Sequence, residues 1–83
     1  MPIPISLAAV MRSICYDCGV QHPELPMLRQ KCIEVAGLYE GVEVVQVALL
    51  FRDWLQQGYS VEQVLEADTK QCADLGKGYQ WQF

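Results

Sequence analysis

Four glycines divide this chain into segments in which apolar residues recur every three or four positions: Gly19, Gly41, Gly58 and Gly76. Such spacing gathers apolar side chains on one face of an α-helix. Glycine just after the last apolar residue is a common helix end, because it adopts a left-handed backbone conformation without strain. The pattern therefore predicts four helices, at about residues 6–18, 26–40, 42–57 and 60–75.

The second predicted helix carries a seam of apolar residues in alternating steps of three and four. The seam consists of Leu25, Leu28, Cys32, Val35 and Tyr39. It lasts two heptads, which is too short for a free coiled coil but suits a helix packed within a bundle.

The third predicted helix is the ambiguous one, because its first residues, 42–47, are rich in valine and also suit a strand. Helical spacing fits the whole run better. One face holds Val44, Val47, Ala48, Phe51, Trp54 and Leu55, and Val45, Leu49 and Leu50 lie beside or off it. A helix that is apolar on more than one side either lies centrally in a bundle or contributes to an oligomer interface.

The fourth predicted helix has the clearest start. Ser60 and Gln63 form a capping box, and Tyr59 before the cap can pack on Val64. Its buried face, which Asp68 interrupts, holds Val61, Val64, Leu65, Cys72 and Leu75. We expect one all-α domain over residues 1–83, a small four-helix bundle.

After the last helix comes an extended C-terminal arm, residues 76–83, in which aromatic residues alternate with glutamine. The alternation places Tyr79, Trp81 and Phe83 on one side of an extended segment. Two alternatives stay open for this arm. It binds another chain, since tyrosine and tryptophan dominate binding hot spots, or it folds back over its own bundle to cover a small core.

Three of the four cysteines and the only histidine fall in one stretch: Cys15, Cys18, His22 and Cys32. Zinc takes four thiolate or imidazole ligands, so these residues are candidate metal ligands, although their spacing matches no standard zinc motif. Cys18 and Cys32 also lie on apolar stripes, where cysteine behaves as a small hydrophobic residue. Buried free thiols are the favoured interpretation, and bound zinc and a disulfide are the alternatives.

Enzymatic chemistry is not expected. The Cys15–Cys18 pair falls in the last turn of the first predicted helix, where the helix dipole opposes a thiolate. His22 lies in a linker beside Pro23, and no glycine-rich turn accompanies it to make an oxyanion hole. The sequence contains no phosphate-binding loop, dinucleotide fingerprint or H-E-x-x-H motif.

The composition of the chain limits the classes of partner that it is expected to bind. A chain of 83 residues that is 52% hydrophobic cannot bury all its apolar surface, so contact with another chain is expected, a homodimer being the simplest form. The net charge is −4 and the basic residues are scattered, which argues against nucleic acid. No segment is long enough to span a membrane and no secretory signal is visible, so we expect a cytoplasmic location.

The function expected from these patterns is a small non-enzymatic protein-binding module that acts as an inhibitor or adaptor of another protein. Small acidic proteins encoded by phages or plasmids offer an analogy. The residues expected to contact the partner are Tyr79, Trp81, Phe83, Trp54 and Leu50. One alternative is a zinc-stabilised module built on Cys15, Cys18, His22 and Cys32. Another is a helix-turn-helix transcriptional regulator, although its recognition helix would be acidic.

Overall fold

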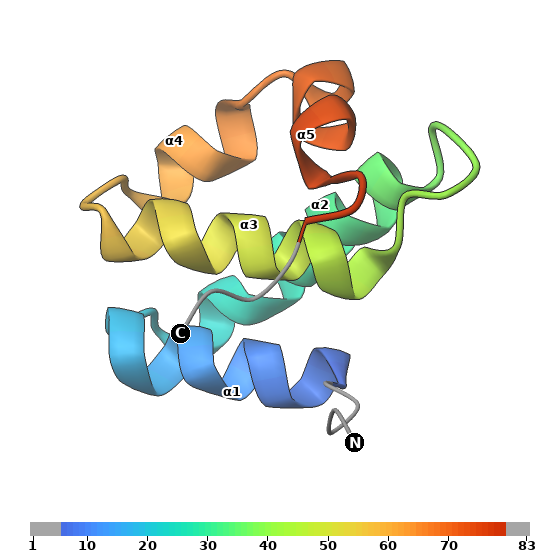
Figure 1. Cartoon of the computed structure of the whole chain (residues 1–83). Coiled ribbons are helices and arrows are strands. Elements are labelled where there is room, and N and C mark those ends of the chain that lie inside the picture. Colours follow the sequence, from blue (N-terminus) through green and yellow to red (C-terminus); the bar gives the residue numbers. More distant parts are fainter. Residues whose placement is uncertain (1–5, 80–83) are drawn as a thin grey trace.

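The computed structural model describes residues 6–79, and every regular element in that range is helical (Figure 1). The elements are α1 (Leu7–Cys18), the short 3-10 helix η1 (His22–Glu24), α2 (Leu25–Ala36), α3 (Val44–Gln56), α4 (Val61–Glu66) and α5 (Thr69–Gly76). The all-α prediction is confirmed. The predicted four-helix arrangement is not, because the described residues form five α-helices.

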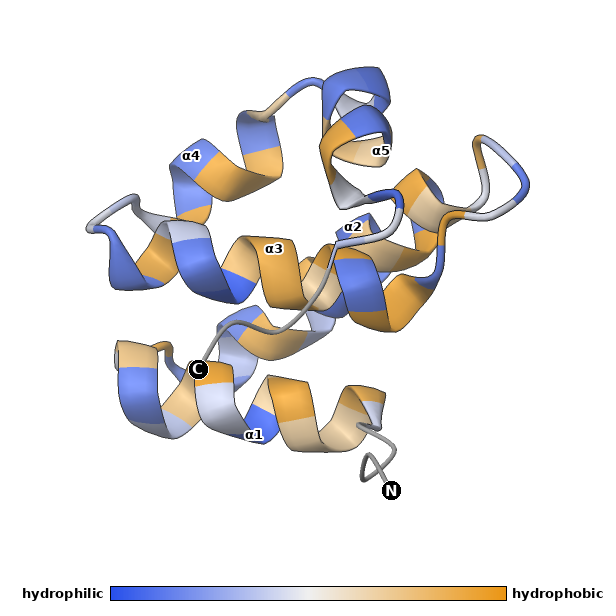
Figure 2. Ribbon diagram, viewed as in Figure 1, coloured by the Kyte–Doolittle hydropathy of each residue, from blue (hydrophilic) through white to orange (hydrophobic). Residues whose placement is uncertain are grey.

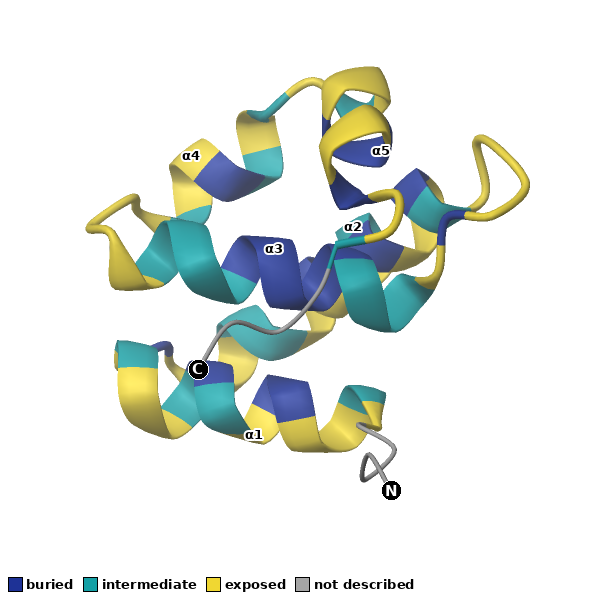
Figure 3. Ribbon diagram, in the orientation of Figure 1, coloured by how far each residue is buried: buried dark blue, intermediate teal, exposed yellow. Residues whose placement is uncertain are grey.

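Helix α3 lies at the centre of the molecule and contacts α1, α2, α4 and α5 (Figure 1). Five consecutive residues, Val47 to Phe51, are buried, so this helix is enclosed on nearly all sides (Figure 3). The central position, one of the two alternatives predicted for this helix, is therefore confirmed. Leu50 is only 4% exposed and belongs to the interior. The prediction that Leu50 contacts a partner is inconsistent with that burial.

Helix α1 begins and ends as predicted. The Ser6 hydroxyl accepts a hydrogen bond from the Ala9 amide at 3.1 Å, and Gly19 ends the helix with a φ of +70°. A polar bridge joins α1 to α3: Arg52 Nε donates to Ser13 Oγ at 2.6 Å, and Ser13 Oγ donates to Asp17 at 2.7 Å. The apolar stripe of α1 faces the core, since Val10 and Ile14 are fully buried.

Helix α2 is shorter than predicted, because it ends at Ala36 and not near residue 40. Glycine inside a helix is about 1 kcal/mol less favourable in free energy than alanine. After Gly37 the hydrogen bonds no longer span four residues as they do in an α-helix. The Leu38 amide there donates to the Val35 carbonyl, three residues back, at 3.2 Å. The predicted seam consequently stops early, and Tyr39 is 42% exposed in the loop before α3.

The predicted helix over residues 60–75 is in fact two helices, α4 and α5, separated by Ala67 and Asp68. The predicted capping box is present: Ser60 Oγ accepts from the Gln63 amide, and Gln63 Oε1 accepts from the Ser60 amide. The backbone then leaves the helix at Ala67, where ψ is 143°. Asp68 restarts it by accepting a hydrogen bond from the Gln71 amide at 3.0 Å. An N-cap aspartate explains the break better than an interrupted apolar face.

Lys31 of α2 fixes the corner between α4 and α5. Its ammonium group donates to the Leu65 carbonyl at 3.0 Å, the Ala67 carbonyl at 2.7 Å and Thr69 Oγ1 at 3.3 Å. The carbonyls at the end of α4 would otherwise lack hydrogen-bond donors, as helix ends do. One side chain therefore ties α2 to the two short helices.

The apolar faces of all five α-helices meet in one core around α3, whose ribbon is largely apolar (Figure 2). Its largest fully buried side chains include Phe51, Ile14 and Leu28. Helix α5 approaches α3 closely at Gly76, where a Cβ atom would lie 3.2 Å from Val47 Cγ2. Glycine at this position permits the two helices to pack at that distance.

The predicted arm begins where α5 ends, at Gly76. Its first aromatic residue, Tyr79, is half-buried and packs against the core, and the neighbouring Gly78 amide donates to Gln46 Oε1 at 3.4 Å. The start of the arm thus lies on its own bundle at α3. Trp81 and Phe83 lie outside the described residues.

Candidate functional site

The four residues predicted as metal ligands do not meet in one site. Cys15 Sγ lies 3.8 Å from His22 Nε2, but the Cys18 thiol points to the Arg52 carbonyl oxygen, also at 3.8 Å. Cys32 is fully buried, with none of its surface exposed. Between residues 6 and 79, no three histidine, cysteine, aspartate or glutamate side chains come together as metal ligands.

All four cysteines are free thiols, and two of them lie in the interior. Burial, with a smaller contribution from the nearby Cys72 of α5, raises the pKa of Cys32 to about 12. Burial also raises the pKa of Cys72, although the positive charge of Lys31 opposes that rise. These two thiols stay protonated near neutral pH and serve as small apolar groups of the core.

The surroundings of Cys18 also disfavour the thiolate. Burial raises its pKa, and the neighbouring Arg52 charge offsets the rise only in part. A reactive cysteine requires the opposite environment, one that favours the thiolate. The geometry therefore gives no support to a redox pair of Cys15 and Cys18.

A concave pocket of about 250 Å³ lies between the end of α3 and helices α4 and α5. We call it the aromatic pocket. Its lining residues are Trp54, Tyr59, Gln63, Val64, Ala67 and Gln71. They include no carboxylate, ammonium, guanidinium or imidazole group. The pocket therefore suits an uncharged group, and its two amides can donate and accept hydrogen bonds.

Two aromatic contacts hold the wall of this pocket in place. The rings of Phe51 and Trp54 stack with centroids 5.7 Å apart, and Phe51 is fully buried. The rings of Trp54 and Tyr59 meet edge-to-face at 6.5 Å. Tyr59 itself remains 51% exposed. A rigid indole and an accessible phenol ring thus face the solvent together, and both lose little entropy on binding.

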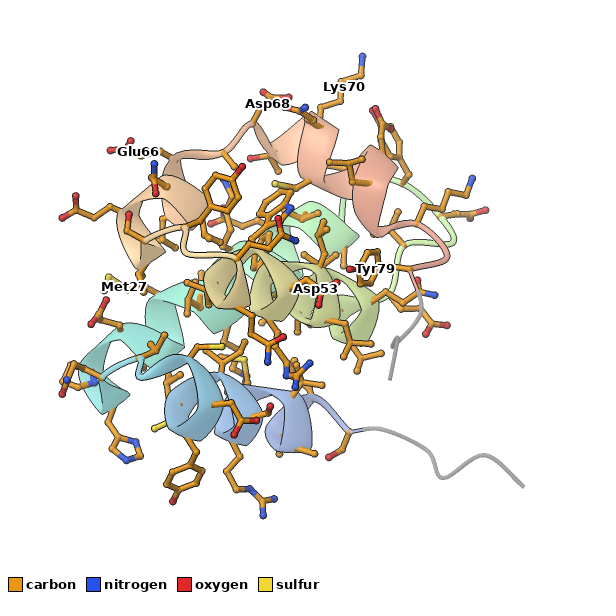
Figure 4. The ribbon with its side chains drawn as sticks, turned by 60° about the vertical axis from the view of Figure 1, so that its left-hand side comes forward. Met27, Asp53, Glu66, Asp68, Lys70 and Tyr79 are labelled. Carbon is orange, nitrogen blue, oxygen red and sulfur yellow. The ribbon has the colours of Figure 1, made fainter. Side chains whose placement is uncertain are left out.

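The outer edge of the same region is acidic. Glu62, Glu66 and Asp68 are exposed on α4 and at the start of α5, and two cations accompany them: Lys70 of α5 and Lys31 of α2, whose ammonium group bonds at the corner between the two helices. Figure 4 shows Glu66, Asp68 and Lys70 projecting outward along that edge. None of these charged side chains lines the aromatic pocket, although Glu62, Glu66 and Lys70 belong to α4 and α5, which contribute to its wall.

The residues predicted to bind a partner therefore lie in different parts of the structure. Trp54 lines the aromatic pocket, Leu50 lies in the core, and Tyr79 packs on the bundle outside the pocket lining (Figure 4 labels Tyr79). Tyr59 was not among the residues predicted to bind a partner, since the sequence pattern indicated only that it packs on Val64 at a helix start. Its position in the turn, five residues after a tryptophan, was the available signal.

Comparisons of the chain with protein families, with curated proteins and with solved structures found no match. Among residues 6–79, no helix is both long and apolar enough to cross a membrane.

Proposed function

We propose that this chain is a non-enzymatic protein-binding module whose aromatic pocket receives one apolar side chain of its partner. The observation that carries the proposal is the Trp54–Tyr59 pair, an anchored indole beside an exposed phenol ring in a concave site. Tryptophan and tyrosine in such positions supply most of the energy of many protein interfaces.

The size and lining of the pocket indicate what it binds. About 250 Å³ is below the range of drug-sized ligand pockets and suits a single large side chain. Gln63 and Gln71 flank the apolar wall and can bond to the peptide backbone that carries that side chain. We therefore expect a peptide segment of another protein rather than a free small molecule.

The acidic edge adds a second requirement. Glu62, Glu66 and Asp68 would attract a segment with lysine or arginine beside its apolar residue. Complementary charges at the rim mainly raise the association rate and select among partners. A module that only occupies a partner's surface would act as an inhibitor or adaptor. Its free cysteines suit a reducing compartment such as the cytoplasm.

The proposal is tested with synthetic peptides that carry one central aromatic residue other than tryptophan, flanked by lysine, alanine or glutamate. A Trp81→Phe background leaves Trp54 as the sole tryptophan, so its fluorescence reports occupancy of the pocket. We expect the lysine-flanked peptides to bind most tightly. Tyr59→Ala should weaken that binding by about tenfold or more.

Tyr16 supplies the matched control, because it is an exposed tyrosine, 74% accessible, on the distant helix α1. Tyr16→Ala should leave peptide affinity unchanged. Equal losses in the two variants would show that the aromatic pocket is not the binding site. Equal affinity for lysine-flanked and glutamate-flanked peptides would remove the charge requirement and leave the apolar one.

A further inference from the structure

A cysteine and a histidine stand together on the surface at the turn from α1 to η1. Cys15 lies in the last turn of α1 and is half-buried, and His22 is the exposed first residue of η1. The thiol sulfur and the imidazole Nε2 are 3.8 Å apart. Neither residue lines the aromatic pocket, so the proposed function leaves the pair unused.

The turn that joins the two residues is fixed by its own packing. Gly19 takes the left-handed conformation that ends α1, and Val20, only 6% exposed, inserts into the core. The Glu24 amide then donates to the Gln21 carbonyl at 2.9 Å and closes η1. The two side chains are thereby positioned before any ligand binds, which lowers the entropy cost of binding.

The separation of the two atoms matches that of two ligands of one zinc ion. Zinc lies about 2.3 Å from a thiolate and about 2.0–2.1 Å from an imidazole nitrogen, which at a tetrahedral angle places the ligands about 3.6 Å apart. The observed 3.8 Å needs an adjustment of only a few tenths of an ångström. A metal bound there would replace the thiol proton, which passes to solvent.

This chain cannot complete the tetrahedron from the residues that the structure describes. Cys18 points away to the Arg52 carbonyl, Cys32 is enclosed in the core, and no third ligand of residues 6–79 joins the pair. A second copy supplies what is lacking, because a two-fold axis through the metal brings an identical cysteine and histidine.

We propose that Cys15 and His22 form one half of a zinc site that joins two copies of this chain in a Cys2His2 tetrahedron. Tyr16 supports the choice of a second copy as occupant. It follows Cys15 directly and is 74% exposed, the most accessible large apolar side chain of the described residues. Association through the metal would cover that ring in both copies and add an aromatic contact to the coordination bonds.

The test titrates the reduced full-length chain with zinc and follows its mass by sedimentation velocity. We expect half an equivalent of zinc per chain and a monomer-to-dimer shift. Cobalt serves as a spectroscopic substitute and should give the absorption of a tetrahedral thiolate site. Cys15→Ser and His22→Ala should each weaken metal binding at least tenfold, whereas Cys18→Ser, the control, should bind as the parent does.

Each other outcome overturns the proposal. If one zinc ion binds per chain and the sedimenting mass does not change, the site does not join two copies. Loss of zinc binding in Cys18→Ser would show that Cys18 is a third ligand within the same chain. If the parent chain binds no zinc, the proposed site does not exist. Circular dichroism of each variant shows that the helices persist. Tyr59→Ala should still dimerise with zinc, so failure here and failure of the aromatic pocket can be told apart.

Discussion

Two of the places where a cysteine lies beside a second functional group are chemically opposite. At the turn after α1, the half-buried Cys15 lies 3.8 Å from His22, which is exposed to solvent. Between α2 and α5, Cys32 and Cys72 lie in a core that keeps both thiols protonated. The difference shows that a cysteine's position on its helix, and not its spacing in the sequence, decides whether it is available to bind.

The largest expected effect is on alkylation. With iodoacetamide at pH 8, Cys32 should react at least about 10³-fold more slowly in the folded chain than in urea, because a thiol of pKa about 12 is rarely ionised there. Cys15, at the surface, should be modified within the folded chain. Peptide mapping by mass spectrometry measures both rates. Comparable alkylation rates of Cys15 and Cys32 in the folded chain would show that the two thiols do not differ in accessibility and ionisation.

The next effect is on stability at alkaline pH. The raised pKa means that the unfolded chain loses the Cys32 proton first, near its ordinary pKa, while the folded chain keeps the proton until about pH 12. The stabilisation by the neutral thiol is thus complete below about pH 8.5–9 and falls by about 1.4 kcal/mol per pH unit above that. Urea unfolding of the reduced chain from pH 8 to 11 measures the slope.

Cys32→Ala is the control for that slope, since tyrosines and lysines also titrate in this range. The substitution should lower stability at pH 8 and flatten the decline above pH 9 relative to the parent. Parallel curves for the two chains would mean that the interior does not hold this thiol in its neutral form.

The smallest effect concerns what holds α5 over the interior pair. Lys31→Met removes the donor to two carbonyls and a hydroxyl at the α4–α5 corner, and should cost about 1–3 kcal/mol. Amide hydrogen exchange should accelerate in α4 and α5 more than in α1. Lys70→Met, an exposed lysine of α5, should change stability by no more than about 0.5 kcal/mol. Equal effects of the two substitutions would show that Lys31 does not fix the corner.

The sequence pattern was sufficient to predict where helices form, but it did not predict where they are interrupted. Apolar spacing located α1 and α3, and the Ser60–Gln63 capping box located the start of α4. The break at Asp68 was missed because apolar residues continue on both sides of it. Lys31, more than thirty residues away in sequence, donates hydrogen bonds to the Leu65 and Ala67 carbonyls at this break, and spacing within one segment does not show such a tertiary contact.

The candidate site was predicted in part for the same reason. Trp54 was among the residues expected to contact a partner, but the aromatic pocket needs the bend between α4 and α5, which the single predicted helix lacked. Leu50 was misplaced because spacing along one helix does not show how many neighbours surround it. The separation of Cys15 and His22 from Cys18 and Cys32 likewise depends on side-chain directions that spacing alone does not give.

The close approach of α5 to α3 at Gly76 has an evolutionary consequence. Even alanine there would bring its methyl group within 3.2 Å of Val47 Cγ2, so Val47 would have to move. A residue larger than alanine at position 76 needs still more space, which a smaller residue at position 47 would provide. In homologous sequences, we therefore expect substitutions at positions 76 and 47 to be correlated, because the two residues are in contact.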